Sequence, residues 1–188
     1  MKRFYCSGSM LVLLSSYTLS AQATTFDVDS SKSSVNFLAV GKPGFLKIKG
    51  GGATVSGSVK DGAEGFSGTL TVQLADLKTG LSMRDDHMQG KYLESSKFPT
   101  AVLKLNKVVF QDKAEGSCTF EGNLELKGKS KEIGGTCKIT GLDSDVAKVN
   151  ATLVVKIEDY PIGIPSHLGV TVADQVTITA DLQAPKKK

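Results

Sequence analysis

Alternation of apolar and polar residues runs through most of this 188-residue chain and restricts its fold more than any other feature. Between Phe66 and Leu74, apolar residues and glycine occupy one phase, while serine, threonine and glutamine occupy the other. The segment from Ala147 to Ile157 repeats the pattern. A period of two places successive side chains on opposite faces of a strand. We therefore expect antiparallel strands that each bury one face and expose the other.

Eight or nine such segments are separated by short turns rich in glycine, lysine and aspartate. This spacing is typical of a sandwich or a barrel, and closing the sheet into a barrel would remove its exposed edges. Eight strands enclose an interior that side chains fill or that is just wide enough for one small ligand. The lack of tryptophan and the small inward residues leave room for a cavity, whereas phenylalanine and leucine are the candidates to fill it. The expected strands are 25–30, 34–40, 46–59, 66–74, 100–110, 118–126, 133–139, 147–157 and 176–182.

The first 23 residues have the features of a secretory signal peptide. Lys2 and Arg3 form a positive region, an apolar run centred on residues 10–14 follows, and Ala21-Gln-Ala23 is an A-x-A cleavage site. A membrane anchor is disfavoured because the apolar run is too short to span a bilayer. We expect cleavage near Ala23, a bacterial periplasmic or secreted location, and one domain over residues 24–188.

The charge balance argues against a nucleic-acid partner. The formal net charge is +4, and removing the two basic residues of the leader leaves +2. A nucleic-acid binder normally carries a basic stripe. Here the lysines are scattered and alternate with apolar residues, which is typical of the solvated faces of strands.

Cys118 and Cys137 are the two cysteines that follow the leader. Both occupy the apolar phase of neighbouring expected strands, and an oxidising compartment favours a bond between them. Cross-strand geometry is demanding, so the pattern leaves open whether they are bonded or free. A metal site is disfavoured because neither cysteine belongs to a CxxC pair.

The segment Thr79–Thr100 interrupts the alternation and predicts a short helix. Ser82 can cap it, Asp85 suits its first turn, and Pro99 ends it. Arg84 is the only arginine outside the leader. An ion pair between Arg84 and Asp85 that closes the helix over the barrel is at least as good an explanation of these residues as a ligand site.

Motifs for catalysis are absent: there is no GxSxG, HExxH, phosphate loop or dinucleotide fingerprint. An Asp-His pair with a distant serine is a weak signal for a hydrolytic triad. His87 and His167 with Asp85 or Asp86 would make an unconvincing metal site. We therefore expect a non-enzymatic protein without a metal or cofactor.

Three blocks of the sequence resemble the YceI-like family. Arg84-Asp-Asp-His-Met88, with Tyr92-Leu93 and Phe98-Pro-Thr-Ala101, is similar to the family's R-D-x-H-[LM]…F-P-x-[AI] block. Phe26–Phe37 is similar to its first strand pair, and Gly122–Gly128 to its L-x-L-x-G hairpin. The resemblance covers residues 25–183. It departs from the family where Lys32-Ser33 stands in place of the usual His-Ser, which excludes a histidine role there.

The resemblance implies an all-β antiparallel, eight-stranded, extended lipocalin-like barrel with one short helical insertion. It also implies an exported protein that holds a polyprenyl phosphate or a quinone. Such a chain is insoluble in water, and each buried CH₂ is worth about 0.8 kcal/mol. An elongated barrel can shield it and leave a polar head at the mouth.

We therefore expect a carrier for an isoprenoid-type lipid, with transient membrane contact allowed and pairing of two chains left open. The alternative is a ligand-free structural or interaction protein of the cell envelope, with a filled interior. A third reading, an enzyme acting on a bound lipid, has the least support. In the first reading, Arg84 orients the lid or reaches the head group. The expected lipid-binding residues are Phe37, Leu70, Val72, Leu103, Leu153 and Val155 in the channel, Met83, His87, Met88 and Tyr92 in a lid, and Arg84.

Overall fold

The structure is a computed structural model, and it describes residues 23–42, 46–63, 65–111, 116–167 and 170–187. Apart from Ala23, the predicted leader lies outside these residues. Within them, eleven strands form one antiparallel sheet, with one short α-helix and three other helical turns. No helix in the described part of the chain is long and apolar enough to cross a membrane.

The strands follow the alternating segments of the sequence, and the helical elements follow their interruptions. The strands are β1 (Thr24–Asp27), β2 (Ser34–Lys42), β3 (Lys47–Ala53), β4 (Val55–Gly62), β5 (Gly65–Gln73), β6 (Thr100–Phe110), β7 (Gly116–Leu126), β8 (Lys129–Thr140), β9 (Val146–Lys156), β10 (Ser166–His167) and β11 (Val170–Pro185). The helical elements are η1 (Leu74–Asp76), α1 (Ser82–His87), the π-helical η2 (Met88–Leu93) and η3 (Ile157–Asp159).

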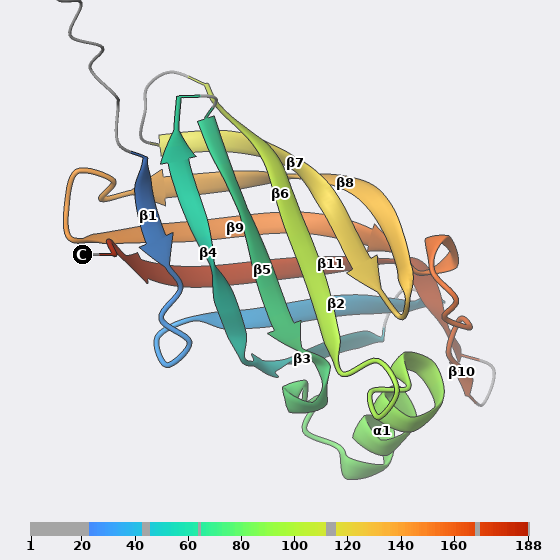
Figure 1. Cartoon of the computed structure of the whole chain (residues 1–188). Helices are drawn as coiled ribbons and strands as arrows, with labels where there is room; N and C mark the ends of the chain where they lie inside the picture. Colours follow the sequence, from blue (N-terminus) through green and yellow to red (C-terminus); the bar gives the residue numbers. More distant parts are fainter. Residues whose placement is uncertain (1–22, 43–45, 64, 112–115, 168–169, 188) are drawn as a thin grey trace, which may run out of the picture.

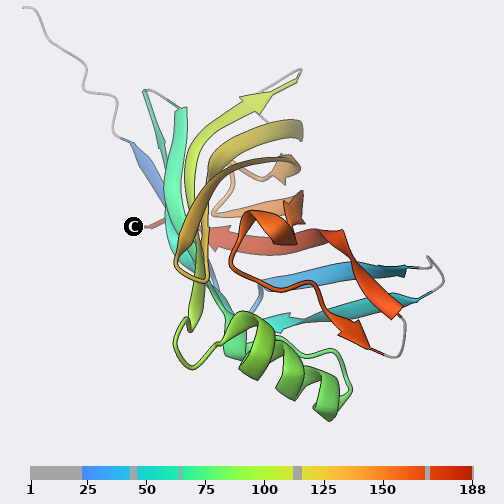
Figure 2. The same cartoon turned by 90° about the vertical axis from the view of Figure 1, so that its right-hand side faces the viewer.

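The sheet is strongly curled. Its strand order is β1-β4-β5-β6-β7-β8-β9-β11-β2-β3, and β10 pairs with β11 off this path. Because β3 and β4 are separated only by Thr54, the chain itself joins two strands near opposite ends of the path. Phe26 also bridges to Lys186, and Gly51 to Lys78. Figures 1 and 2 show the resulting half-barrel, with α1 at one end and β1 with the C-terminus at the other.

The predicted all-β antiparallel fold with one helical insertion is confirmed, but the described chain has eleven strands rather than eight. The expected strand 46–59 is two strands, because the chain bends after Gly52, which has a φ of +82°. β1 has four residues and β10 has two, so both are short additions to the sheet. Glycine in a strand interior commonly marks such a bend, because it has no Cβ to restrict its backbone.

The apolar phase of every long strand faces the concave side of the sheet. Register places Phe37 opposite Ile178, and Ile178 opposite Leu153. Leu103 lies opposite Leu124 in the same way. These side chains pack around two main clusters, one centred on Val55 and one on Cys118, and Val149 contacts both. The concave side is therefore one continuous apolar surface.

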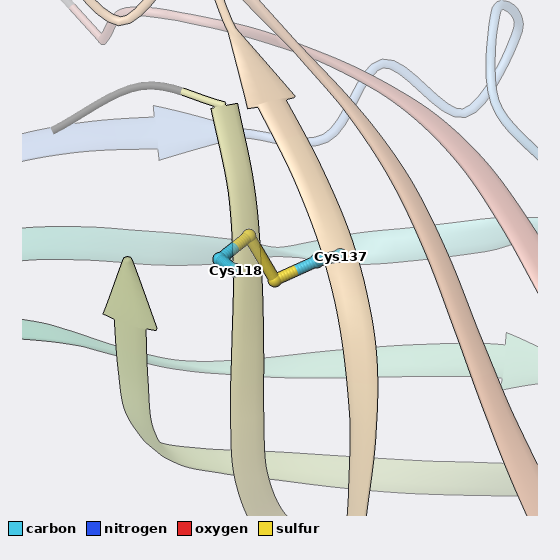
Figure 3. Close-up of a disulfide and its surroundings, with 2 residues drawn as sticks. All are labelled: Cys118 and Cys137. Carbon is cyan, nitrogen blue, oxygen red and sulfur yellow. A yellow bond between two sulfur atoms is a disulfide. The ribbon is translucent and has the colours of Figure 1, made fainter. Parts of the chain in front are cut away.

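Cys118 and Cys137 form a disulfide across β7 and β8 (Figure 3). The two residues are directly opposite in the register, and their Cα atoms are 4.8 Å apart. Both side chains are buried on the concave side, with Phe120 and Ile139 in the same cluster. The pairing that the sequence left open is thus present in the structure.

Candidate functional site

The concave apolar surface is the main candidate site, because its own side chains do not bury it. Most apolar residues in the middle of this surface are only half-buried, although their side chains are on the concave side of the sheet. Among the described residues, Val55 and Cys118 are the largest side chains with less than 2% of their surface exposed. Close-packed interiors contain many more such side chains. The half-barrel therefore presents apolar surface that another apolar molecule can cover.

The structure brings five of the six expected channel residues together as half-buried side chains on this surface. Val155 is further along β9 and is buried at 6% exposure. Phe37 also lies against Gly50, where an added Cβ would be 2.3 Å from its ring, so glycine is required there. The half-buried five are Phe37, Leu70 and Val72, packed on the Val55 cluster, and Leu103 and Leu153, packed on the Cys118 cluster.

The expected lid is only partly correct. The segment 82–93 forms α1 and η2 at one end of the half-barrel (Figure 1). Met88 packs against the Val55 cluster, together with Leu93. Met83 is 70% exposed and His87 is exposed, so neither lies over the apolar surface. The helix is short and turns these two positions to solvent.

Arg84 and Asp85 do not form the expected ion pair, because both bond to Thr79. Arg84 donates from Nε to the Thr79 hydroxyl (2.8 Å) and from Nη2 to the Thr79 carbonyl (2.9 Å). Asp85, buried at 8% exposure, accepts from the Thr79 hydroxyl and backbone N–H. These hydrogen bonds from Thr79 hold the pKa of Asp85 below its ordinary value despite burial. The expected cap residue, Ser82, makes no capping bond; it is the first residue of the helix, which Leu81 precedes.

Tyr92 and Gln89 join the helical segment to its surroundings. Gln89 donates from Nε2 to the carbonyls of Ala75 and Leu77, at 2.8 and 3.0 Å. Tyr92 is half-buried, and its carbonyl accepts a hydrogen bond from the Nζ of Lys127 at 2.9 Å. The predicted role of Tyr92 in contacting lipid therefore stays a prediction, while its backbone anchors the segment.

Lys127 is the residue that the sequence analysis missed. Sequence indicated only a hairpin turn at Lys127, but the side chain is buried at 9% exposure and its Nζ is 2.6 Å from Oε1 of Glu94. Glu94 follows η2 and also pairs with Lys97 at 2.9 Å. Glu94 and Lys127 are the two non-glycine residues with positive φ among the described residues, at +48° and +50°. The ion pair therefore offsets two unfavourable backbone conformations and holds the cap to the β7–β8 hairpin.

Replacing Glu94 by Gln is expected to remove a pH-dependent part of the stability. Lys127 first, and then Lys97, lower the pKa of Glu94 from 4.5 to about 2. A lowered folded-state pKa stabilises the protein above the unfolded-state value, and this contribution is lost as the pH falls from about 4.5 to about 2. Urea unfolding at pH 6 and pH 3 should show a smaller loss on acidification in Glu94→Gln than in the wild type. The exposed Asp86→Asn of α1 is the control; equal losses in wild type and Glu94→Gln would contradict the assignment.

Two clefts lie on the described residues, the first mainly on the convex side of the sheet, where Thr177 is opposite Val154, and the second at the β1 end of the half-barrel. The lysine cleft, of about 510 Å³, is lined by Asn36, Phe37, Leu38, Lys49, Gly50, Lys78, Thr79, Thr177 and Thr179. The phenylalanine cleft, of about 410 Å³, is lined by Thr24, Phe26, Asp61, Gly65, Phe66, Val108, Phe110, Leu142, Asp143 and Lys186. In the second cleft, the rings of Phe66 and Phe110 meet edge to face at 5.8 Å.

Among the described residues, no group of three His, Cys, Asp or Glu side chains is arranged to hold a metal ion. The side chain of His167, one of the weak metal candidates, falls outside what the structure describes. What the described residues do present is a binding surface with a cap at one end.

Comparison with known proteins agrees with this geometry. The family model of the YceI-like domain matches residues 26–184. Burkholderia cenocepacia BcnA has a similar structure, with a TM-score of 0.71, 22% identity, and coverage of 84% of this chain and 99% of that one. A polyisoprenoid binding domain from Saccharophagus degradans, implicated in plant cell wall breakdown, has a TM-score of 0.67, 17% identity, and coverage of 86% and 98%. The Campylobacter jejuni YCEI protein has a TM-score of 0.61, 20% identity, and coverage of 77% and 88%. No curated protein matches the sequence.

Proposed function

Since this chain belongs to the YceI-like family, we propose that it is a periplasmic or secreted carrier of a long isoprenoid-type lipid. The observation that carries the proposal is the half-exposed apolar surface inside the half-barrel. A prenyl chain laid along it would remove apolar surface of both molecules from water, at about 0.8 kcal/mol per buried CH₂. The similar Saccharophagus protein, described as a polyisoprenoid binding domain, supports the same class of ligand.

The position of the cap suggests that a lipid would enter or leave the half-barrel at that end. Met88 and Leu93 cover part of the apolar surface there, and their segment is tied down through Thr79, Gln89 and Lys127. Leu81 and Met83, at the start of α1, are 58% and 70% exposed. Exposed apolar side chains beside the cap suit transient contact with a membrane, where an insoluble lipid would be collected or delivered.

Mass spectrometry of the intact protein tests the proposal. Protein purified from its host under non-denaturing conditions should carry an adduct of lipid mass, because a long prenyl chain would dissociate slowly into water. Extraction with an organic solvent should release the adduct and identify it as a prenyl phosphate, a quinone or another lipid. Consistently ligand-free protein that also fails to take up added prenyl lipid would refute the proposal.

The alternative, a ligand-free structural or interaction protein of the envelope, draws on the same exposed Leu81 and Met83. It requires a protein partner rather than a lipid. Pull-down from envelope extracts, compared with lipid extraction of the same sample, separates the two. A stoichiometric protein partner without any bound lipid would favour the alternative.

A further inference from the structure

We propose that the phenylalanine cleft binds a small organic ammonium ion with an apolar body. The cleft lies at the end of the half-barrel opposite to α1, where β1 and the C-terminus are found (Figure 1). Its volume of about 410 Å³ is within the range of about 300 to 1,000 Å³ that is usual for small-molecule pockets. The site therefore goes beyond the proposed carrier function, because the cleft is large enough to hold a ligand of its own.

Three phenylalanine rings form the apolar wall of the cleft. The rings of Phe66 and Phe110, both half-buried, meet edge to face with their centroids 5.8 Å apart. Phe110 also packs against the Cys118 cluster, and Phe26 belongs to a separate buried cluster at this end of the sheet. The face of an aromatic ring carries partial negative charge and attracts a cation within about 6 Å of the ring centroid. The wall therefore favours a ligand that combines apolar surface with a positive charge.

A carboxylate shares the concave face of the sheet with these rings. Asp61 is directly opposite Phe66 in the register of β4 and β5, and it has the same phase along β4 as the buried Val55. Asp61 is half-buried, and Asp143 lines the cleft from the turn between β8 and β9. In the part of the chain that the structure describes, neither aspartate takes part in an ion pair. Both carboxylates are therefore available to a cationic ligand.

Lys186 shows that the cleft accepts an ammonium group. This half-buried residue lines the cleft, and its Nζ is 6.0 Å from the centroid of the Phe26 ring. The formal charges of Asp61, Asp143 and Lys186 leave the lining at −1, so the ammonium of Lys186 does not neutralise it. Because charge that lines a cleft raises the local concentration of counter-ions, the lining attracts a further cation and repels an anion.

Calorimetric titration tests the site with three probes that share one body and differ in charge: 3-phenylpropylammonium, 3-phenylpropanol and 3-phenylpropanoate. The wild type should bind the ammonium probe about fivefold or more tightly than the alcohol, since the ring faces and the carboxylates attract only the charged probe. It should bind the carboxylate probe most weakly of the three.

The double variant Asp61→Asn/Asp143→Asn should lose the preference for the ammonium probe and keep its affinity for the alcohol. The charge-matched control is Asp86→Asn/Glu132→Gln, which changes exposed acidic residues outside the cleft and should bind like the wild type. Lys186→Gln should bind the ammonium probe about threefold more tightly than the wild type, because it removes the competing cation. A misfolded variant would not produce this gain, and circular dichroism melting checks the fold of each variant.

The site is refuted if the wild type binds none of the probes, binds the ammonium and the alcohol equally, or binds the carboxylate most tightly. It is also refuted if the Asp61→Asn/Asp143→Asn variant keeps the ammonium preference, or if the control variant loses it. None of these results bears on the carrier function, which is tested separately with prenyl lipids. The two proposals can therefore fail independently.

Discussion

Replacing Ala180 by Phe should weaken prenyl-lipid binding at least tenfold while leaving the fold intact. Ala180 is half-buried on the concave side, between Val35 on β2 and Ala151 on β9. A phenyl ring there occupies the space through which the lipid chain would run. Displacing only two methylene groups from the apolar surface costs about 1.6 kcal/mol, which is more than tenfold in affinity. Titration with geranylgeranyl monophosphate measures the change.

The matched control is Val154→Phe, which adds an aromatic ring to an exposed position on the convex side of β9. It should bind lipid like the wild type. Thermal unfolding of Ala180→Phe also reports on the interior, because overpacking a filled core costs about 1 to 3 kcal/mol. Marked destabilisation, or unchanged lipid binding, would show that the half-barrel does not hold a ligand at its centre.

Removing the disulfide should lower the free energy of unfolding by about 3 kcal/mol, the value expected for a loop closed by residues 19 positions apart. The bond restricts the unfolded chain, and in the folded state it lies within the buried Cys118 cluster. The variant Cys118→Ser/Cys137→Ser would also place two hydroxyl groups in this apolar cluster, so Cys→Ala at both positions is the cleaner choice. Urea unfolding of that variant, monitored by circular dichroism, measures the loss.

Wild-type protein unfolded in the presence of a reductant is the second measurement. It should approach the stability of the double alanine variant, because both lack the crosslink in the unfolded state. The register of β7 and β8 should survive reduction, since eleven pairs of residues still align along the hairpin. If reduction leaves the urea midpoint unchanged, the crosslink does not contribute to stability as proposed.

Much of the concave surface could be predicted from alternation, because a period of two decides which side chains share a face. Phe37, Leu70, Val72, Leu103 and Leu153 were assigned to that face in advance, and they lie on it. Positions in the helical segment were harder. Met83 and Met88 belong to the same short stretch, yet only Met88 packs inward. This difference was hard to predict, because a helix of one or two turns has no extended apolar stripe from which its orientation can be deduced.

Contacts between segments far apart in the chain could not be predicted from the sequence. The Nζ of Lys127 reaches a carbonyl 35 positions earlier, and no local pattern distinguishes this lysine from the other lysines of the hairpin. Thr79 was likewise passed over, although it holds both Arg84 and Asp85. The one sequence feature that marks Lys127 is its place in the turn after an alternating strand. That position does not show toward which segment the side chain extends.

The sequence by itself determined the strand-rich class, the face to which each apolar residue belongs, the helical interruption and the family resemblance, because these depend on local periodicity and on short motifs. The tertiary structure alone decided how far the sheet curls, how much of the apolar face stays uncovered, and which polar groups anchor the cap. Those properties arise from pairing between strands far apart in sequence, such as β2 with β11, and from the bend after Gly52. A local pattern specifies which face of a strand is apolar, but only the assembled sheet determines what covers it.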